Sequence, residues 1–100
     1  MSLRLIVRLD AESDINETAF WYDKQRAGLG LKFLDEAHAA IDRVLVNPAA
    51  YRLMRRKPEV RRILLQRFPY RLFYILRPDA VVVFAALHAK GRYRIWTERI

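Results

Sequence analysis

Residues 59–78 read EVRRILLQRFPYRLFYILRP, and this stretch decides the fold that the sequence predicts. Val60–Arg67 and Tyr70–Arg77 are rich in β-branched, aliphatic and aromatic residues, which favour strands. Phe68-Pro69 separates them, because proline fixes its own φ and has no N–H to donate to a sheet ladder. The stretch therefore predicts a β-hairpin with a tight turn.

The second strand of this hairpin is apolar on both faces. Successive side chains of a strand point to opposite faces of the sheet. One face carries only aromatic and aliphatic residues, and the other carries Phe73 and Ile75 between Arg71 and Arg77. We therefore expect the hairpin in the centre of a sheet, with the apolar run Ala80–Leu87 as a third strand beside it.

The N-terminal half predicts one strand and two helices. Leu3–Leu9 alternates in the manner of a strand with one strongly apolar face. Asp10 is a good N-cap for a helix that runs to about Arg26. Apolar residues recur at helical spacing over Leu31–Val46, and Asn47-Pro48 ends that second helix. The short glycine-containing link between the helices predicts an antiparallel hairpin.

The remaining segments are less regular. Residues 49–58 are interpreted as a basic connection, and residues 93–100 leave a short strand and a helical turn equally open. The resulting order, β-α-α-β-β-β, predicts an α+β fold in which an N-terminal strand and a helix hairpin pack with a mainly antiparallel, twisted sheet. With 100 residues and no internal repeat, we expect residues 1–100 to form a single domain.

The net charge of +8 and the pI near 10.4 indicate what kind of partner the protein binds, and they do not indicate its fold. Most basic residues follow Tyr51, so the sheet should carry the basic surface. Nucleic acid and an acidic protein segment are the two obvious partners. No apolar run approaches the ~20 residues of a membrane span. Charged residues at positions 4, 8 and 10 interrupt any signal-peptide core, so we expect a cytoplasmic protein without a membrane partner.

The sequence lacks the residues and motifs that several classes of enzyme require. The chain has no cysteine, no phosphate-binding or dinucleotide-binding glycine motif and no nucleophile elbow. His38 and His88 are not at metal-ligand spacing, and His38 falls in the middle of a predicted helix. We therefore expect no metal and no cofactor.

Basic residues of the predicted hairpin and of the last strand form the main candidate site. Arg61, Arg62, Arg67 and Arg71 are expected to face one concavity together with His88, Lys90 and Arg92. Arginine binds phosphate bidentately, and histidine exchanges protons near neutral pH. Tyr70, Tyr74 and Trp96 would stack on bases. The alternative is that the arginines only solvate the sheet and the aromatic rings fill the core; net charge and position together favour binding.

Landmarks along nearly the whole chain resemble the RelE/ParE superfamily of type II toxin–antitoxin toxins, and its ParE (plasmid-stabilisation) branch in particular. They are, in order, Ala11 and Asp14-Ile15 with Trp21-Tyr22; Gly28-Leu29-Gly30 with Phe33; Asn47-Pro48 with Tyr51; Val60-Arg61-Arg62; Phe68-Pro69-Tyr70 with Tyr74; and His88 with Trp96 and Arg99.

The resemblance implies a toxin of two helices against a twisted antiparallel sheet, with an antitoxin encoded beside it. Such an antitoxin binds operator DNA through its own N-terminal part, so the toxin would meet the operator only indirectly. Its C-terminal tail would wrap the toxin, and an acidic, apolar tail suits a +8 surface.

The resemblance leaves the target open between DNA gyrase and the ribosome. ParE-like toxins trap cleaved DNA on gyrase, whereas RelE-like toxins cleave mRNA on the ribosome with a pair of lysines, whose positions match Arg62 and Leu64 here. The arginine after the turn of those nucleases matches Arg71. Their later arginine falls near Gly91, which Lys90 and Arg92 flank, and their C-terminal tyrosine falls near Trp96 or Thr97, neither of which has a phenol. The incomplete set favours a gyrase inhibitor without chemistry of its own.

Two sets of residues follow from this interpretation. A nuclease would use Arg62, Arg71, His88, Lys90 and Arg92. Contact with a target or an antitoxin is expected from Arg61, Arg62, Arg67, Arg71, Tyr74, Lys90, Arg92, Trp96 and Arg99. A homologue that has lost toxicity and binds only its antitoxin is a third possibility.

Overall fold

The computed structural model describes residues 3–91 and 93–100 of the chain. Its elements are β1 (Arg4–Val7), α1 (Leu9–Gln25), α2 (Leu29–Val46), the 3-10 turn η1 (Pro48–Ala50), β2 (Arg52–Arg55), β3 (Val60–Leu64), β4 (Tyr70–Leu76), β5 (Ala80–His88) and α3 (Tyr93–Arg99). The strands form one sheet in the order β1-β5-β4-β3-β2. β1 runs parallel to β5, and the other neighbours are antiparallel. The predicted α+β fold is therefore confirmed.

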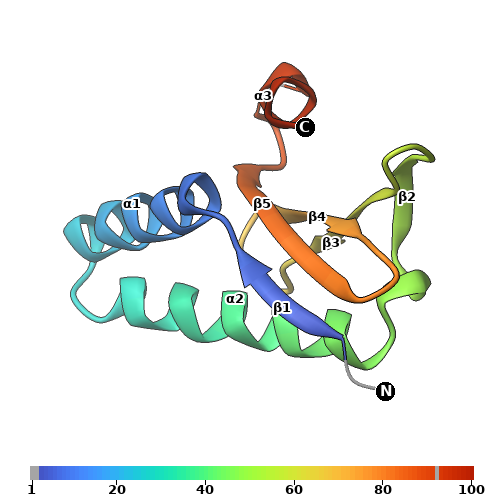
Figure 1. Ribbon diagram of the computed structural model, residues 1–100. Coiled ribbons are helices and arrows are strands. Elements are labelled where there is room, and N and C mark those ends of the chain that lie inside the picture. Colours follow the sequence, from blue (N-terminus) through green and yellow to red (C-terminus); the bar gives the residue numbers. More distant parts are fainter. Residues whose placement is uncertain (1–2, 92) are drawn as a thin grey trace.

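Two apolar clusters hold the molecule together, one on each face of the sheet. α1 and α2 cover one face, which we call the helix face, and α3 stands by the end of β5 and packs on the other, the α3 face (Figure 1). Leu72 and Tyr74 of β4 are buried on the helix face, whereas Phe73 and Ile75 are buried on the α3 face. The central position expected for this strand is confirmed, since β4 lies between β3 and β5.

The helix hairpin follows the predicted apolar spacing. Each helix buries one stripe against the sheet, made of Ala11, Ile15 and Ala19 on α1 and Ala37, Ile41 and Val44 on α2. Gly28 adopts the left-handed conformation with φ 88°, and Gly30 lies so close to the Ala19 carbonyl and the Asp23 side chain that a Cβ would clash. The Asp23 carboxylate accepts the Gly30 N–H at 2.7 Å, which fixes this tight turn.

Three predictions for the N-terminal half are wrong. The first strand ends at Val7 instead of Leu9, because the Arg8 N–H makes a backbone bond to the Val83 carbonyl and the chain then turns into α1. Arg8, not Asp10, occupies the N-cap position, and Asp10 lies in the first turn, where it pairs with Arg8 at 3.0 Å. α2 begins at Leu29 instead of Leu31, because the left-handed glycine before it completes the turn within few residues.

The predicted connection and the open C-terminal segment both contain regular structure. Residues 49–58 include η1 and the short edge strand β2, which pairs with β3 and places Arg52 opposite Arg62. β3 ends at Leu64, earlier than the predicted Arg67. Residues 93–99 form a helix, and Trp96 anchors it on the α3 face.

Candidate functional site

A small hollow lies on the α3 face, between the sheet and α3; we call it the arginine hollow. Its volume is about 70 Å³. Arg62, Arg71 and His88 are its polar lining residues, and Phe73 and Trp96 contribute to its apolar wall. Of the seven residues expected to share one concavity, these three are brought together.

Strand register places three arginines side by side near this hollow. Arg52 and Arg62 are direct cross-strand partners on β2 and β3. Arg62 is opposite Phe73, and Arg71 lies two residues before Phe73 on β4, so Arg62 and Arg71 are diagonal neighbours. Direct partners have Cβ atoms about 5 Å apart and diagonal ones about 7–8 Å apart. We call Arg52, Arg62 and Arg71 the arginine row.

The three arginines of the row repel one another and have no ion-pair partner in the described part of the chain. Burial lowers the pKa of Arg62 from its usual value, and the neighbouring charges of Arg71 and Arg52 lower it further. None of the ion pairs found among residues 3–91 and 93–100 includes a member of the row. The Nε atom of Arg71 is buried and, within the same described part, has no hydrogen-bond partner.

Two other candidate arginines are engaged in holding the fold. Arg61 points to the opposite side from Arg62 and donates to Glu59 at 2.7 Å and to the carbonyls of Ala49 and Tyr51. Arg99 donates to both carboxylate oxygens of Asp14, at 2.6 and 3.1 Å, and to the Phe84 carbonyl. The hydrogen bond from Arg99 to Asp14 is the main reason that the pKa of Arg99 is raised.

The remaining candidates are distributed around the hollow or away from it. Tyr74 is fully buried, and its hydroxyl donates to the Pro48 carbonyl. Trp96 is 2% exposed and stacks on Phe73 with ring centroids 5.6 Å apart. Arg67 lies in the β3–β4 turn, where its backbone N–H donates to Glu36 of α2.

The end of β5 contributes a histidine with defined contacts. His88 is exposed, its Nδ1 accepts the Lys90 N–H at 3.0 Å, and its ring packs edge-on against Tyr70. Lys90 is exposed beside it but does not line the hollow. Arg92 lies outside the described residues.

Arg52 belongs to the site although sequence reasoning left it out. It is the first residue of β2, a four-residue strand that was interpreted as a connection. The available signal was the alternation of Arg52 and Met54 with Leu53, which is too short to distinguish a strand from a loop.

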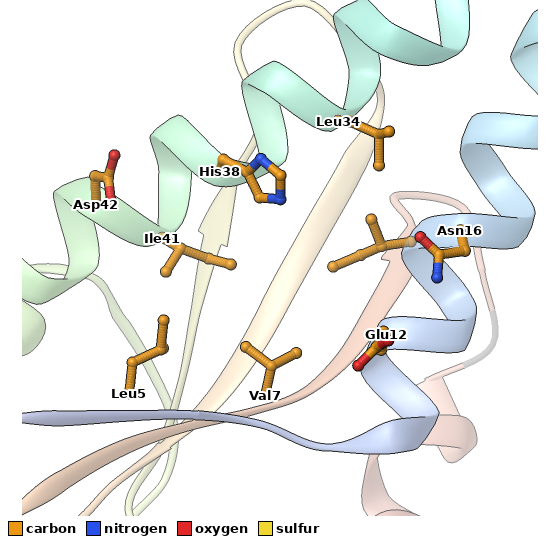
Figure 2. A pocket seen from close by; sticks show the side chains of 9 residues that line it. Leu5, Val7, Glu12, Asn16, Leu34, His38, Ile41 and Asp42 are labelled. Atoms are coloured by element: carbon orange, nitrogen blue, oxygen red, sulfur yellow. The ribbon is translucent and has the colours of Figure 1, made fainter.

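A second hollow of about 490 Å³ lies between β1, α1 and α2, and we call it the helix groove. Figure 2 shows Leu5 and Val7 pointing into it from β1, Leu34 and Ile41 from α2. Its polar lining residues are Glu12, Asn16, His38 and Asp42. The groove is thus apolar inside and bears carboxylates, unlike the arginine hollow.

Long apolar helices and clusters of metal-ligating side chains are both absent from the part of the chain that is described. No helix there combines the length and the apolar character needed to cross a bilayer. The same residues contain no group of three or more His, Cys, Asp or Glu side chains arranged to hold a metal ion.

Residues 5–93 match the family described as "ParE toxin of type II toxin-antitoxin system, parDE". The chain belongs to this ParE toxin family. The match begins within β1, spans the helix hairpin and the other four strands, and includes the arginine row. No curated protein sequence matches the chain.

Solved structures support the ParE-type fold. A chain described as "Chromosomal ParDE TA system from P. aeruginosa" superposes with a TM-score of 0.75, covering 87% of this chain and 96% of the other. The two sequences are 15% identical, so this likeness concerns the fold alone.

Proposed function

We propose that this ParE-family toxin acts in the cytoplasm on DNA gyrase, as a single domain of residues 1–100, and is neutralised by a cognate antitoxin. The observation that carries the proposal is the family match over residues 5–93. The antitoxin would bind operator DNA, and the toxin would associate with that DNA only through the antitoxin.

The chemistry of the arginine hollow supports a binding protein more than a nuclease. General acid–base catalysis needs positioned groups that give and take protons. Among the residues that line the hollow, His88 has the side-chain type best suited to general acid–base catalysis, and its Nδ1 already accepts the Lys90 N–H. Leu64, which is 54% exposed, is the cross-strand partner of Arg71, at the position where a second basic group would complete the site.

The first test is a gyrase assay with antitoxin-free, folded toxin. Inhibited supercoiling of relaxed plasmid, together with accumulation of linear DNA, is the expected result. Unaffected supercoiling at a large molar excess of folded toxin would contradict the proposed target. A matched topoisomerase that does not supercoil DNA serves as the control for non-specific inhibition.

The antitoxin is proposed to present an acidic and apolar tail to the basic side of the toxin. A hollow of about 480 Å³ between α2, η1, β2 and β3 suits such a tail, because it combines Arg43, Arg52 and Arg62 with Ile63 and Leu64. Arginine pairs bidentately with carboxylates, and the leucine and isoleucine offer apolar contact. The helix groove suits an acidic segment less well, because Glu12 and Asp42 line it.

Charge reversal in this hollow tests the antitoxin surface. Arg43→Glu should weaken antitoxin binding at least tenfold at low salt and less at high salt, since screening reduces surface electrostatics. Arg26→Glu, at an exposed site between the helices, is the matched control. Equal affinity of the two variants, measured by titration calorimetry, would remove this hollow from the antitoxin interface.

A ribosome-dependent endoribonuclease is the second candidate function, favoured by the convergence of Arg62, Arg71 and His88 on one hollow. In that case Arg62 and Arg71 would hold the scissile phosphate, and His88 would transfer protons. Arg71→Ala should then reduce mRNA cleavage by orders of magnitude, whereas a gyrase inhibitor would cleave no mRNA even with Arg71 in place. A toxin that binds antitoxin but affects neither target would be the non-toxic homologue.

A further inference from the structure

The arginine row gathers three positive charges for which the residues that the structure describes provide no carboxylate partner. Like charges directly opposite one another on neighbouring strands destabilise a sheet. Arg52 and Arg62 are such a pair, and Arg71 adds a third charge diagonally. The contrast is with Arg8, Arg61 and Arg99. Each of these partly buried arginines has a carboxylate oxygen within 3.0 Å.

The arginine hollow has the size and the donors for one tetrahedral oxyanion. A volume of about 70 Å³ is far below the roughly 300–1,000 Å³ of pockets for drug-sized ligands, so the hollow suits a small group. The buried Arg71 Nε is a donor without a partner among the described residues, and a buried unsatisfied donor costs about 1–3 kcal/mol. An anion seated beside Arg62 and Arg71 would satisfy this donor and offset the repulsion.

The wider surface indicates that the anion is part of a polymer. The row crosses three adjacent strands, and the turn after β2 adds the exposed residues Arg56 and Lys57. Glu59, a carboxylate just before β3, is paired with Arg61. A repeating array of negative charges matches such a surface better than a single small ion, and each strand of a duplex carries one phosphate per ~3.4 Å of helix axis.

We propose that the arginine row is a phosphodiester-binding site, through which the toxin holds a nucleic-acid backbone without cleaving it. The identity of that nucleic acid rests on the proposed function: it would be the DNA segment bound by gyrase. One phosphate sits between Arg62 and Arg71 at the hollow, and Arg52 contacts the next along the strand. Toxin inhibition would then involve contact with the DNA as well as with the enzyme.

The test measures binding of the full chain to a fluorescein-labelled 20-base-pair DNA duplex by anisotropy, between 50 and 200 mM salt. Arg62→Gln/Arg71→Gln should weaken binding at least tenfold and reduce the slope of log affinity against log salt by about two. The control is Arg26→Gln/Arg77→Gln, which removes the same charge from exposed sites outside the row and should change affinity less than threefold. Arg71→Lys keeps the charge but loses the planar fork of donors. Its DNA affinity should lie between those of the wild type and of Arg62→Gln/Arg71→Gln.

Three results would overturn the proposal: no DNA binding at 50 mM salt, equal losses in the two double variants, or binding of poly-glutamate as tight as that of DNA and equally dependent on Arg71, which does not line the proposed antitoxin hollow. The last would make the row a site for acidic peptides. The gyrase assay on the same proteins separates this inference from the proposed function. Gyrase inhibition without DNA binding removes only the phosphodiester site, whereas row-dependent DNA binding without inhibition removes only the gyrase target.

Discussion

Arg99 and Arg62 are both partly buried arginines on secondary-structure elements that meet the same apolar cluster, but their surroundings are opposite. Arg99 lies against Asp14 and near Asp10, which links α3 to α1 and, through the Phe84 carbonyl, to β5. Arg62 lies between Arg52 and Arg71. The pKa of Arg99 is accordingly raised by its carboxylate partner, and that of Arg62 is lowered by burial and by its neighbours.

The difference shows how to separate arginines that stabilise a fold from arginines available to a partner. A paired guanidinium contributes to the folded state, and its loss leaves a carboxylate exposed to an apolar environment. An unpaired cluster costs stability in the isolated chain and gains free energy only when an anion arrives. Net charge alone cannot make this distinction, since both groups count equally toward +8.

The largest effect is expected from removing the carboxylate that Arg99 binds. Asp14→Ala leaves the Arg99 charge partly buried and also frees the Ala86 N–H, which donates to Asp14 at 2.9 Å. Breaking one side of a buried pair costs about 3–5 kcal/mol, and the residual exposure of both side chains reduces this to about 2–4 kcal/mol here. Urea unfolding gives the free energy directly, with the exposed Glu17→Ala on the same helix as a control expected to change it by less than about 0.5 kcal/mol.

The double variant Asp14→Ala/Arg99→Met sharpens this result. Replacing both charged partners removes the uncompensated charge, so the double variant should be more stable than the sum of the two single variants predicts, by about 1–3 kcal/mol. Simple additivity in the same unfolding experiment would mean that the two side chains do not act as a pair.

An intermediate effect is expected at high pH, on the side of the sheet where Arg61 is paired. Burial raises the pKa of Tyr74 to about 12, with the nearby Arg61 acting in the opposite direction. The unfolded phenol titrates near ~10, so the neutral form is favoured in the folded chain, and its contribution is complete below pH ~10 and is lost as the pH rises toward ~12. Wild-type stability should therefore fall by about 1–3 kcal/mol over that range, as measured by urea unfolding at several pH values.

Tyr74→Phe tests the assignment of that loss. At neutral pH the variant should be about 1 kcal/mol less stable, because the hydroxyl no longer donates to the Pro48 carbonyl. Between pH ~10 and ~12 its stability should decline less steeply than that of the wild type. An unchanged slope would assign the high-pH loss to other groups, such as Tyr22, whose pKa is also raised.

The smallest effect, and one of opposite sign, is expected in the arginine row. Arg62→Gln should change the free energy of unfolding by no more than about 0.5 kcal/mol, toward greater stability, because it relieves repulsion from Arg52 and Arg71. The gain should shrink in high salt. Arg99→Gln, the matched paired arginine, should destabilise the chain under both conditions; a similar loss from Arg62→Gln would end the distinction between the two groups.

Residue type and alternation predicted three residues that line the arginine hollow. They did not predict which of the other arginines would be paired elsewhere. Arg62, Arg71 and His88 were expected to converge and do so. Arg61 was placed with them, although its neighbour Arg62 must point to the opposite face, and the carbonyls that hold it come from residues 49 and 51. Which arginine finds a carboxylate depends on contacts between distant segments, such as the 85 residues that separate Asp14 from Arg99.

Local signals in the sequence determined the two helices, their antiparallel hairpin, and the central hairpin of β3 and β4, because apolar periodicity, glycine and proline act over a few residues. They also determined the basic character of the sheet and the absence of cysteine chemistry. Only the tertiary structure decided that β1 lies parallel to β5, that Arg52–Arg55 forms an edge strand, and that residues 93–99 form a helix over Phe73. The reason is physical: a four-residue strand and a seven-residue helix are too short to be stable alone, so the partners they pack against select their conformation.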